Sequence, residues 1–124
     1  MNRICLFGAS GHGKVIKEII ESEERQVLVF IDDNPKIEKL LNIPVLKTDK
    51  IEEFLSQKFI ISIGDNSIRK IISKKFTLDY ANSIHKSAII SNSSIIKEGT
   101  VVMAGAVINS EVTIGKHCII NSNA

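Results

Sequence analysis

The residues best suited to chemistry lie between positions 8 and 14, in the stretch Gly-Ala-Ser-Gly-His-Gly-Lys. This stretch follows a short apolar run and precedes a segment with helical periodicity. Glycines permit tight turns and let main-chain N–H groups approach a ligand, and a helix N-terminus favours a bound anion. The spacing is G-x-x-G-x-G, which weakens a dinucleotide interpretation. The turn predicts phosphate or sugar-phosphate binding by Gly8, Ser10, Gly11, His12 and Gly13; a strand-to-helix turn without a ligand is the alternative.

A pair of acidic residues, Asp32 and Asp33, ends a second apolar run 24 positions after Gly8. In doubly wound folds an acidic residue roughly 20 positions after the glycine turn often binds ribose hydroxyls. The pair is followed by Asn34-Pro35, which also suits a turn. We therefore expect recognition of a ribose or base, with turn capping as the alternative.

A third apolar run ends at Gly64, Asp65 and Asn66, and Arg69 lies one turn into the next expected helix. Ligands of open α/β sheets bind at the carboxyl ends of the strands. The three polar strand ends are therefore expected to converge on one site. Arg69 suits either a phosphate or carboxylate ligand or a surface position. His12 either contacts the ligand or caps its own helix.

Alternating strands and helices must position these residues, which predicts an α/β fold with a small parallel sheet and helices on its faces. The expected strands are Arg3–Phe7, Val27–Ile31, Ile43–Leu46 and Phe59–Ile63. The expected helices are His12–Glu23, a segment capped by Asp49 that runs to about Gln57, and one from Asn66 or Ser67 to about Phe76. The apolar stripes predicted to face the sheet are Val15, Ile16, Ile19 and Ile20, and Ile68, Ile71 and Ile72.

A six-residue period begins at Ile84 and continues to the last residue. Such a short period indicates a solenoid, here a left-handed parallel β-helix with three hexads per coil and Ser/Asn or Gly corners. We expect residues 1–82 and 83–124 to form two halves packed together, with a hinge at Asn82–Ser83. The first hexad positions are all β-branched: Ile84, Ile90, Ile96, Val102, Ile108, Ile114 and Ile120.

Composition narrows the classes of function. The net charge of +2 comes without a dense Lys/Arg stripe, so nucleic acid is not expected as a partner. No apolar run approaches the roughly 20 residues of a bilayer-spanning helix. The first ten residues lack the features of a signal peptide. Cys5 and Cys118 are expected to be reduced packing residues, and no metal site is expected. These features predict a cytoplasmic protein.

The pattern as a whole resembles the bacterial sugar acetyltransferases that join a Rossmann-like domain to a left-handed β-helix. These include sialic acid O-acetyltransferases and UDP-4-amino-sugar N-acetyltransferases. The resemblance rests on five features: Gly8–Lys14, Ile31–Asp33, Ser62–Asn66 with Arg69, Ile84–Ala88, and the hexads.

The resemblance implies that the N-terminal half holds a nucleotide sugar or sialic acid. Gly11, His12 and Gly13 would meet the sugar nucleotide, and Asp32 and Asp33 the nucleoside end. Gly64 and Asn66 would line the neighbouring face. The β-helix would form a homotrimer with acetyl-CoA between subunits. A histidine base would then remove a proton from the sugar's amine or hydroxyl.

One part of the family pattern is missing. The base histidine of the family follows N-x-x-x-(I/V)-(I/V)-E-H, and Asn121-Ser122-Asn123-Ala124 matches only its start. We therefore assign no catalytic residue within the chain and expect the base to lie beyond Ala124. His85 and His117 are expected to face solvent or a subunit contact.

The β-helix also ends after little more than two coils, which leaves an unpaired strand edge. We expect the N-terminal portion of an acetyltransferase, inactive alone. A non-catalytic module that binds a nucleotide sugar is the alternative. The hexads and the glycine spacing argue against a nicotinamide-dependent oxidoreductase.

Overall fold

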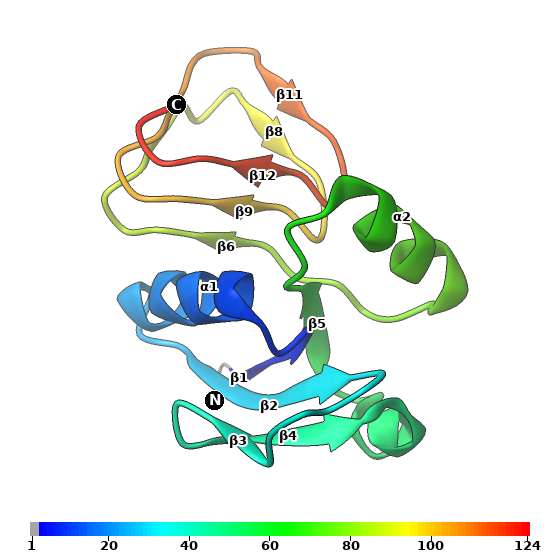
Figure 1. The fold of residues 1–124 in the computed structure, drawn as a ribbon. Helices are drawn as coiled ribbons and strands as arrows, with labels where there is room; N and C mark the ends of the chain where they lie inside the picture. Colours follow the sequence, from blue (N-terminus) through cyan, green and yellow to red (C-terminus); the bar gives the residue numbers. More distant parts are fainter. Residues whose placement is uncertain (1–2) are drawn as a thin grey trace.

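The computed structural model describes residues 3–124 and confirms the α/β sheet followed by a hexapeptide β-helix (Figure 1). The sheet has the order β3-β4-β2-β1-β5, and β3 alone runs antiparallel, paired with β4. Its strands are β1 (Arg3–Phe7), β2 (Gln26–Asp32), β3 (Lys39–Leu40), β4 (Ile43–Lys47) and β5 (Lys58–Ile61). The helical segments are α1 (Gly11–Ser22), the 3-10 helix η1 (Thr48–Phe54) and α2 (Asn66–Lys75).

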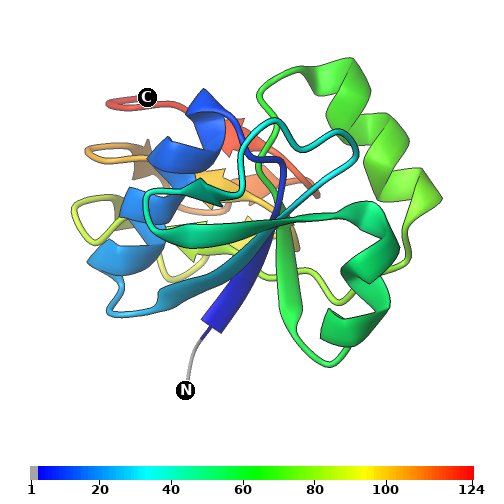
Figure 2. The same cartoon turned by 60° about the horizontal axis from the view of Figure 1, so that its bottom comes forward.

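The central strands bury both of their faces, which explains their continuous apolar sequences. In β1, Ile4 and Leu6 pack in the cluster that contains Ile16 and Ile20 of α1. Cys5 and Phe7 point the other way, into the cluster that η1 and α2 cover. Figure 2 shows α1 and α2 on opposite sides of the sheet.

Three local expectations were wrong. The segment after β4 is a 3-10 helix whose N-cap position is Lys47, so Asp49 does not cap it. Val15 of α1 is 40% exposed. Ile68 and Ile71 are 48% and 62% exposed, and of the three α2 isoleucines only Ile72 is buried. Ile68 and Ile71 are exposed because α2 turns the face that carries Arg69 and Ile72 toward the interior.

The six-residue period produces triangular coils of three hexads each, as expected. Each short strand pairs in parallel with the equivalent strand of the next coil, as Ile84 does with Val102 and Val102 with Ile120. The second residue of each short strand therefore points into the coil, where these residues form a common cluster. The strands are β6 (Ser83–Ile84), β7 (Ile89–Ile90), β8 (Ile95–Ile96), β9 (Val101–Val102), β10 (Val107–Ile108), β11 (Thr113–Ile114) and β12 (Ile119–Ile120).

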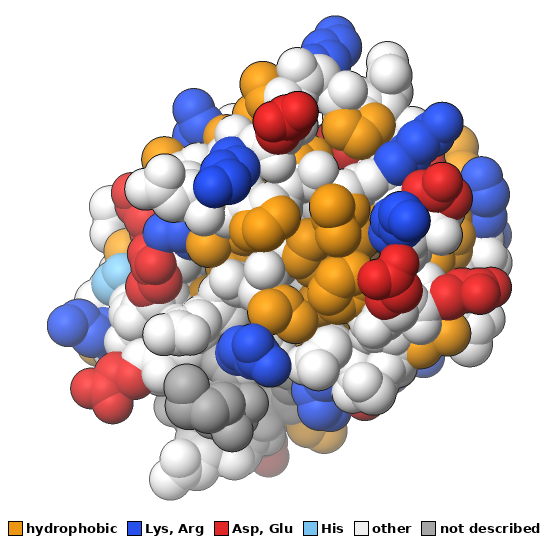
Figure 3. Space-filling view, turned by 90° about the horizontal axis from the view of Figure 1, so that it is seen from below, with side chains coloured by type: hydrophobic (Ala, Val, Ile, Leu, Met, Phe, Trp, Pro, Cys, Tyr) orange, Lys and Arg blue, Asp and Glu red, His pale blue; other side chains and the backbone are white. Residues whose placement is uncertain are grey.

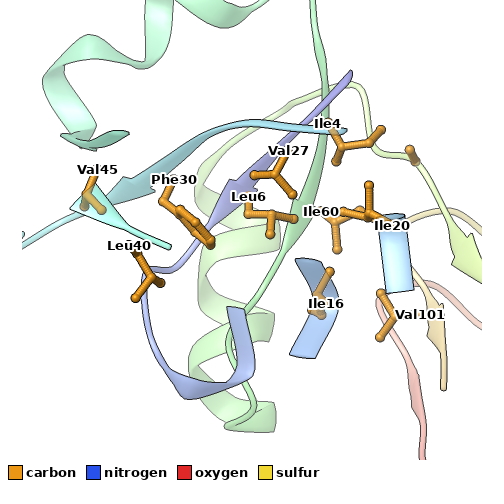
Figure 4. Close-up of a cluster of buried hydrophobic side chains, with 11 residues drawn as sticks. Ile4, Leu6, Ile16, Ile20, Val27, Phe30, Leu40, Val45, Ile60 and Val101 are labelled. Carbon is orange, nitrogen blue, oxygen red and sulfur yellow. The ribbon is translucent and has the colours of Figure 1, made fainter. Parts of the chain in front are cut away.

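The coil packs directly on α1, so the two halves share one hydrophobic cluster. Val101 lies beside Ile16 and Ile20 in this cluster (Figure 4). Arg25, just after α1, donates a 2.9 Å hydrogen bond to the carbonyl of Asn82. Ser83 donates one of 2.6 Å to Glu23.

The opposite end of the molecule carries the β3–β4 hairpin. Exposed hydrophobic residues of the sheet half include Ile37, Leu41 and Leu55. Figure 3, seen from this end, shows hydrophobic side chains gathered at the centre of the face with charged groups around them. Across residues 3–124, no helix combines the length and the apolar character needed to cross a membrane.

Candidate functional site

The turn between β1 and α1 is held tightly against the neighbouring strands. Gly8 has a φ of +128°, and a Cβ there would lie 2.6 Å from Cγ1 of Ile63. Its N–H donates to the carbonyl of Ile31, at 2.7 Å. Its carbonyl accepts a 2.7 Å hydrogen bond from the fully buried hydroxyl of Ser62. Gly8 is therefore required by packing and by backbone conformation.

The other two glycines of the turn differ in what surrounds them. At Gly13 a Cβ would lie 2.8 Å from the Gly8 carbonyl oxygen and 3.0 Å from the Phe30 ring. At Gly11, the first residue of α1, no atom of residues 3–124 lies within 4 Å of that position. Packing thus explains Gly13, whereas Gly11 leaves open space above the helix terminus.

Among residues 3–124, no side chain caps the main-chain donors at the N-terminus of α1. Ser10 is the N-cap residue, but its hydroxyl makes no capping hydrogen bond. The first turn carries no acidic side chain. The partial positive charge of this terminus is therefore available to an anion.

The carboxylates of Asp32, the last residue of β2, and of Asp33 bond to neighbouring loops. Asp32 accepts a 3.1 Å hydrogen bond from the N–H of Ala9 and one of 2.9 Å from the N–H of Asn34. Asp33 accepts a hydrogen bond from the hydroxyl of Thr48. Asp32 thereby joins the glycine turn to the β2–β3 loop.

These two loops enclose a pocket of about 400 Å³, here called the strand-end pocket. Lys36 supplies its cationic group, and Ile37 and Val45 its large apolar side chains. The pocket thus offers both polar and apolar contacts beside the helix terminus. Its lining residues are Ala9, Ser10, Asp32, Asn34, Lys36, Ile37 and Val45.

A second pocket, of about 350 Å³, lies where the sheet half meets the coil; we call it the junction pocket. His12 lines it, and its buried Nε2 has no hydrogen-bond partner among residues 3–124. Burial, followed by the charge of Arg69, lowers the pKa of His12 and favours the neutral ring. The lining residues are His12, Gly64, Asn66, Met103, Ile119 and Asn121.

The residues around the start of α2 shape the loop that lines the junction pocket. Asp65 caps α2 by accepting a 2.9 Å hydrogen bond from the N–H of Ile68. Arg69 is only 8% exposed, and its guanidinium donates to the carbonyls of Ile63, Gly64 and His117 and to Oδ1 of Asn66. Its hydrogen bonds are thus made within the chain.

The remaining histidines lie apart from both pockets. On a turn, Nδ1 of His85 accepts a hydrogen bond from the N–H of Ser87. His117 is partly buried, with its ring edge-on to Tyr80 at a centroid distance of 4.4 Å. Burial is the main cause that lowers the pKa of His117. His117 does not simply face solvent, because its ring packs against Gly99 of the preceding coil.

The predicted site residues thus lie together along one edge of the sheet, as expected for polar residues at the carboxyl ends of neighbouring parallel strands. The glycine turn contacts Asp32 on one side and the Ser62–Gly64 segment on the other. Sequence reasoning missed Lys36 and the coil residues Met103, Ile119 and Asn121. The coil residues had a signal in the period, since Met103 and Asn121 are three hexads apart and hence stack one coil above the other.

Two protein-family models match the chain. The PglD N-terminal domain matches residues 3–76, and the bacterial transferase hexapeptide (six repeats) matches residues 93–124. A UDP-N-acetylbacillosamine N-acetyltransferase of Bacillus subtilis is 38% identical over 102 residues. The match takes in 75% of this chain and 47% of that protein, so the chain spans about half the length of this curated relative.

The chain is also similar to solved structures of acetyltransferases. A perosamine N-acetyltransferase mutant of Caulobacter crescentus, in complex with CoA and GDP-perosamine, is 31% identical with a TM-score of 0.87. The acetyltransferase domain of PglB from Neisseria gonorrhoeae is 27% identical with a TM-score of 0.84. The match covers 99% of this chain in both cases, but 61% and 63% of the respective structures.

Proposed function

Because the chain belongs to the family of PglD-type sugar N-acetyltransferases, we propose that it binds a nucleotide-linked amino sugar as the acceptor of an acetyl group from acetyl-CoA. The observation that carries this proposal is the pair of pockets on either side of the glycine turn. The strand-end pocket takes the nucleotide, and the junction pocket takes the sugar. The relatives support nitrogen as the acetylated atom, since both named enzymes are N-acetyltransferases.

The proposed site residues act in two ways. Ser10, Gly11 and His12 contact the ligand: the open helix terminus binds the diphosphate, and the neutral His12 ring hydrogen-bonds the sugar. Gly64 and Asn66 form the neighbouring wall of the junction pocket. The others hold the loops in place, and these are Gly8, Gly13, Asp32, Asp33, Asp65 and Arg69.

In the proposed reaction the sugar amine attacks the thioester carbonyl of acetyl-CoA. A C–N bond forms and the C–S bond breaks; a base takes the amine proton, and the CoA thiolate leaves and is protonated. We assign no base among the histidines of this chain, because His12 is proposed to hydrogen-bond the sugar and the other two are engaged elsewhere. His85 already accepts a hydrogen bond on a surface turn, and the buried Nδ1 of His117 packs against Gly99. The proposed acetyl-CoA site lies between β-helices of a homotrimer.

Calorimetric titration of the chain with UDP- and GDP-linked 4-amino sugars tests the proposal. Free sialic acid and NAD serve as competing candidates. We expect saturable binding of a nucleotide amino sugar and none of NAD. Release of free CoA thiol, measured in the same samples with acetyl-CoA present, tests for turnover.

The outcomes separate the candidate functions. Binding without turnover supports an acceptor-binding role for these residues. Turnover would contradict our assignment of no base within the chain. A chain that binds no nucleotide sugar at all would overturn the proposal.

A further inference from the structure

Arg69 is a buried cation whose hydrogen-bond partners among residues 3–124 are all neutral. Its Nε donates to the carbonyl of His117 at 2.8 Å, and one terminal nitrogen donates to the carbonyls of Ile63 at 3.0 Å and Gly64 at 3.2 Å. The other terminal nitrogen donates to Oδ1 of Asn66 at 2.6 Å. These acceptors point at the guanidinium from different segments. Only a forked, multi-donor group satisfies them at once, which lysine cannot do.

The first of these segments is the loop from Gly64 to Asn66, which lines the junction pocket. Because a trans peptide places its C=O and N–H on opposite sides, the N–H groups of Gly64 and Asp65 point away from Arg69. Neither N–H has a hydrogen-bond partner among residues 3–124. The loop therefore carries two free main-chain donors whose direction depends on Arg69.

The second segment is the coil corner at His117, 48 residues further along the chain. His117 has a φ of +54°, and its N–H donates to the carbonyl of Glu98. Its ring lies against Gly99 and edge-on to Tyr80. Close packing leaves this corner little free space around the His117 carbonyl. A displacement of the Arg69 guanidinium, which is hydrogen-bonded to that carbonyl, is therefore transmitted to the corner.

We infer that Arg69 is a positioning residue that couples the Gly64–Asn66 loop to the coil corner at His117. Ligand binding in the junction pocket therefore changes the environment of His117 in the β-helix. The identity of the ligand rests on the proposed function. The coupling rests on the hydrogen bonds of Arg69. His117 does not line the junction pocket; it lines a different pocket, of about 410 Å³. Because Asn66 lines both pockets, a response of His117 to the ligand counts as coupling through Arg69 only if substitution of Arg69 removes it.

The three histidines of the chain provide the readout by nuclear magnetic resonance. His12 reports the junction pocket, His117 reports the coil corner, and His85 serves as the reference. The probe is a UDP-linked 4-amino sugar, with UDP alone as a second probe. In the wild-type chain we expect the amino sugar to shift the ring signals of His12 and His117 but not of His85.

Two substitutions and one matched control test the coupling. Arg69→Lys retains the charge but loses the fork, and Arg69→Met loses both. Each is expected to raise the Kd for the amino sugar about tenfold and to abolish the His117 response while His12 still responds at saturation. Lys70→Met, at the exposed neighbouring position, is expected to change neither quantity. A full His117 response in both Arg69 variants, or an unchanged Kd, would overturn the inference.

Amide hydrogen exchange without ligand separates this inference from the proposed function. Arg69→Met is expected to accelerate exchange at residues 68–69, whose N–H groups bond to Asp65, and at residues 117–118, but not at Lys14, whose N–H bonds to Ser10. If Arg69→Met does not fold, as judged by circular dichroism, Arg69→Lys takes its place. Acceleration confined to one of the two segments would contradict the coupling. Absence of amino-sugar binding by the wild-type chain would instead contradict the proposed function.

Discussion

Gly11 and Gly13 are two residues apart, yet their surroundings assign them different roles. Alanine at Gly13 would collide with the Gly8 carbonyl and the Phe30 ring, so Gly13→Ala is expected to lower the free energy of unfolding by about 1–3 kcal/mol. Alanine at Gly11 meets nothing and is expected to raise it by roughly 0.5 kcal/mol, because Gly11 is helical. Urea unfolding measures both changes.

The same pair tests whether a ligand uses the open space at Gly11. A Cβ at this position would obstruct an approaching phosphate, so Gly11→Ala is expected to weaken nucleotide-sugar binding at least tenfold while the fold remains intact. Calorimetric titration measures the Kd. Unchanged affinity in a fully folded Gly11→Ala chain would show that the ligand does not approach the backbone here.

Buried histidines make stability depend on pH. Burial lowers the pKa of both His12 and His117 below their unfolded value of 6.5, so the unfolded chain binds more protons in this range. The free energy of unfolding therefore falls as pH drops through 6.5 toward the lowered pKa values, and levels off below them. His117→Asn is expected to reduce this slope. Asparagine suits the left-handed corner, as Asn123 does one hexad later with a φ of +61°.

Urea unfolding at several pH values between 8 and 5 tests this prediction. His85→Asn is the matched control on an exposed turn and should retain the wild-type slope. A slope that is the same in His117→Asn and in the wild type would contradict a contribution from His117.

At the scale of elements, the coil depends on left-handed corners that stack on one another from coil to coil. At Gly99 φ is +80°, and a Cβ would lie 2.2 Å from Nδ1 of His117. Gly99→Ala is therefore expected to cost about 2–4 kcal/mol of unfolding free energy. Gly115→Ala is the control, because its Cβ would meet only the Cys118 Sγ at 3.8 Å. Thermal unfolding should show little change for Gly115→Ala, and equal losses in both variants would contradict the stacking argument.

At the scale of the whole molecule, the cluster shared by α1 and the coil predicts that both halves unfold together. Val101 is 1% exposed in that cluster, and Val101→Ala is expected to lower the free energy of unfolding by about 2 kcal/mol. The loss should appear equally in circular dichroism, which follows the helices of the sheet half, and in the ring signals of His85 and His117 in nuclear magnetic resonance, which follow the coil. Two separate transitions would instead indicate two independent domains.

The sequence by itself determined four of the five sheet strands, the two α-helices, the coil of three hexads and the polar strand ends, but not the antiparallel strand β3. These features arise from periodicity and turn chemistry, which are local in the chain. Because the carboxyl ends of parallel strands lie at one edge of a sheet, the sequence also predicted that the glycine turn, Asp32 and Gly64 would lie together.

Only the tertiary structure decided what each of these residues contacts. Asp32 accepts hydrogen bonds from two loops. Ile68 and Ile71 are exposed to solvent. Arg69 donates a hydrogen bond to the carbonyl of His117, 48 residues along the chain. The junction pocket likewise needs His12 from α1 and Asn121 from the coil. Such contacts join segments that are distant in the chain, and they depend on how α1 and α2 pack against the sheet and the coil. No local pattern encodes that packing, which is why the sequence predicted that these residues would lie together but not what each of them contacts.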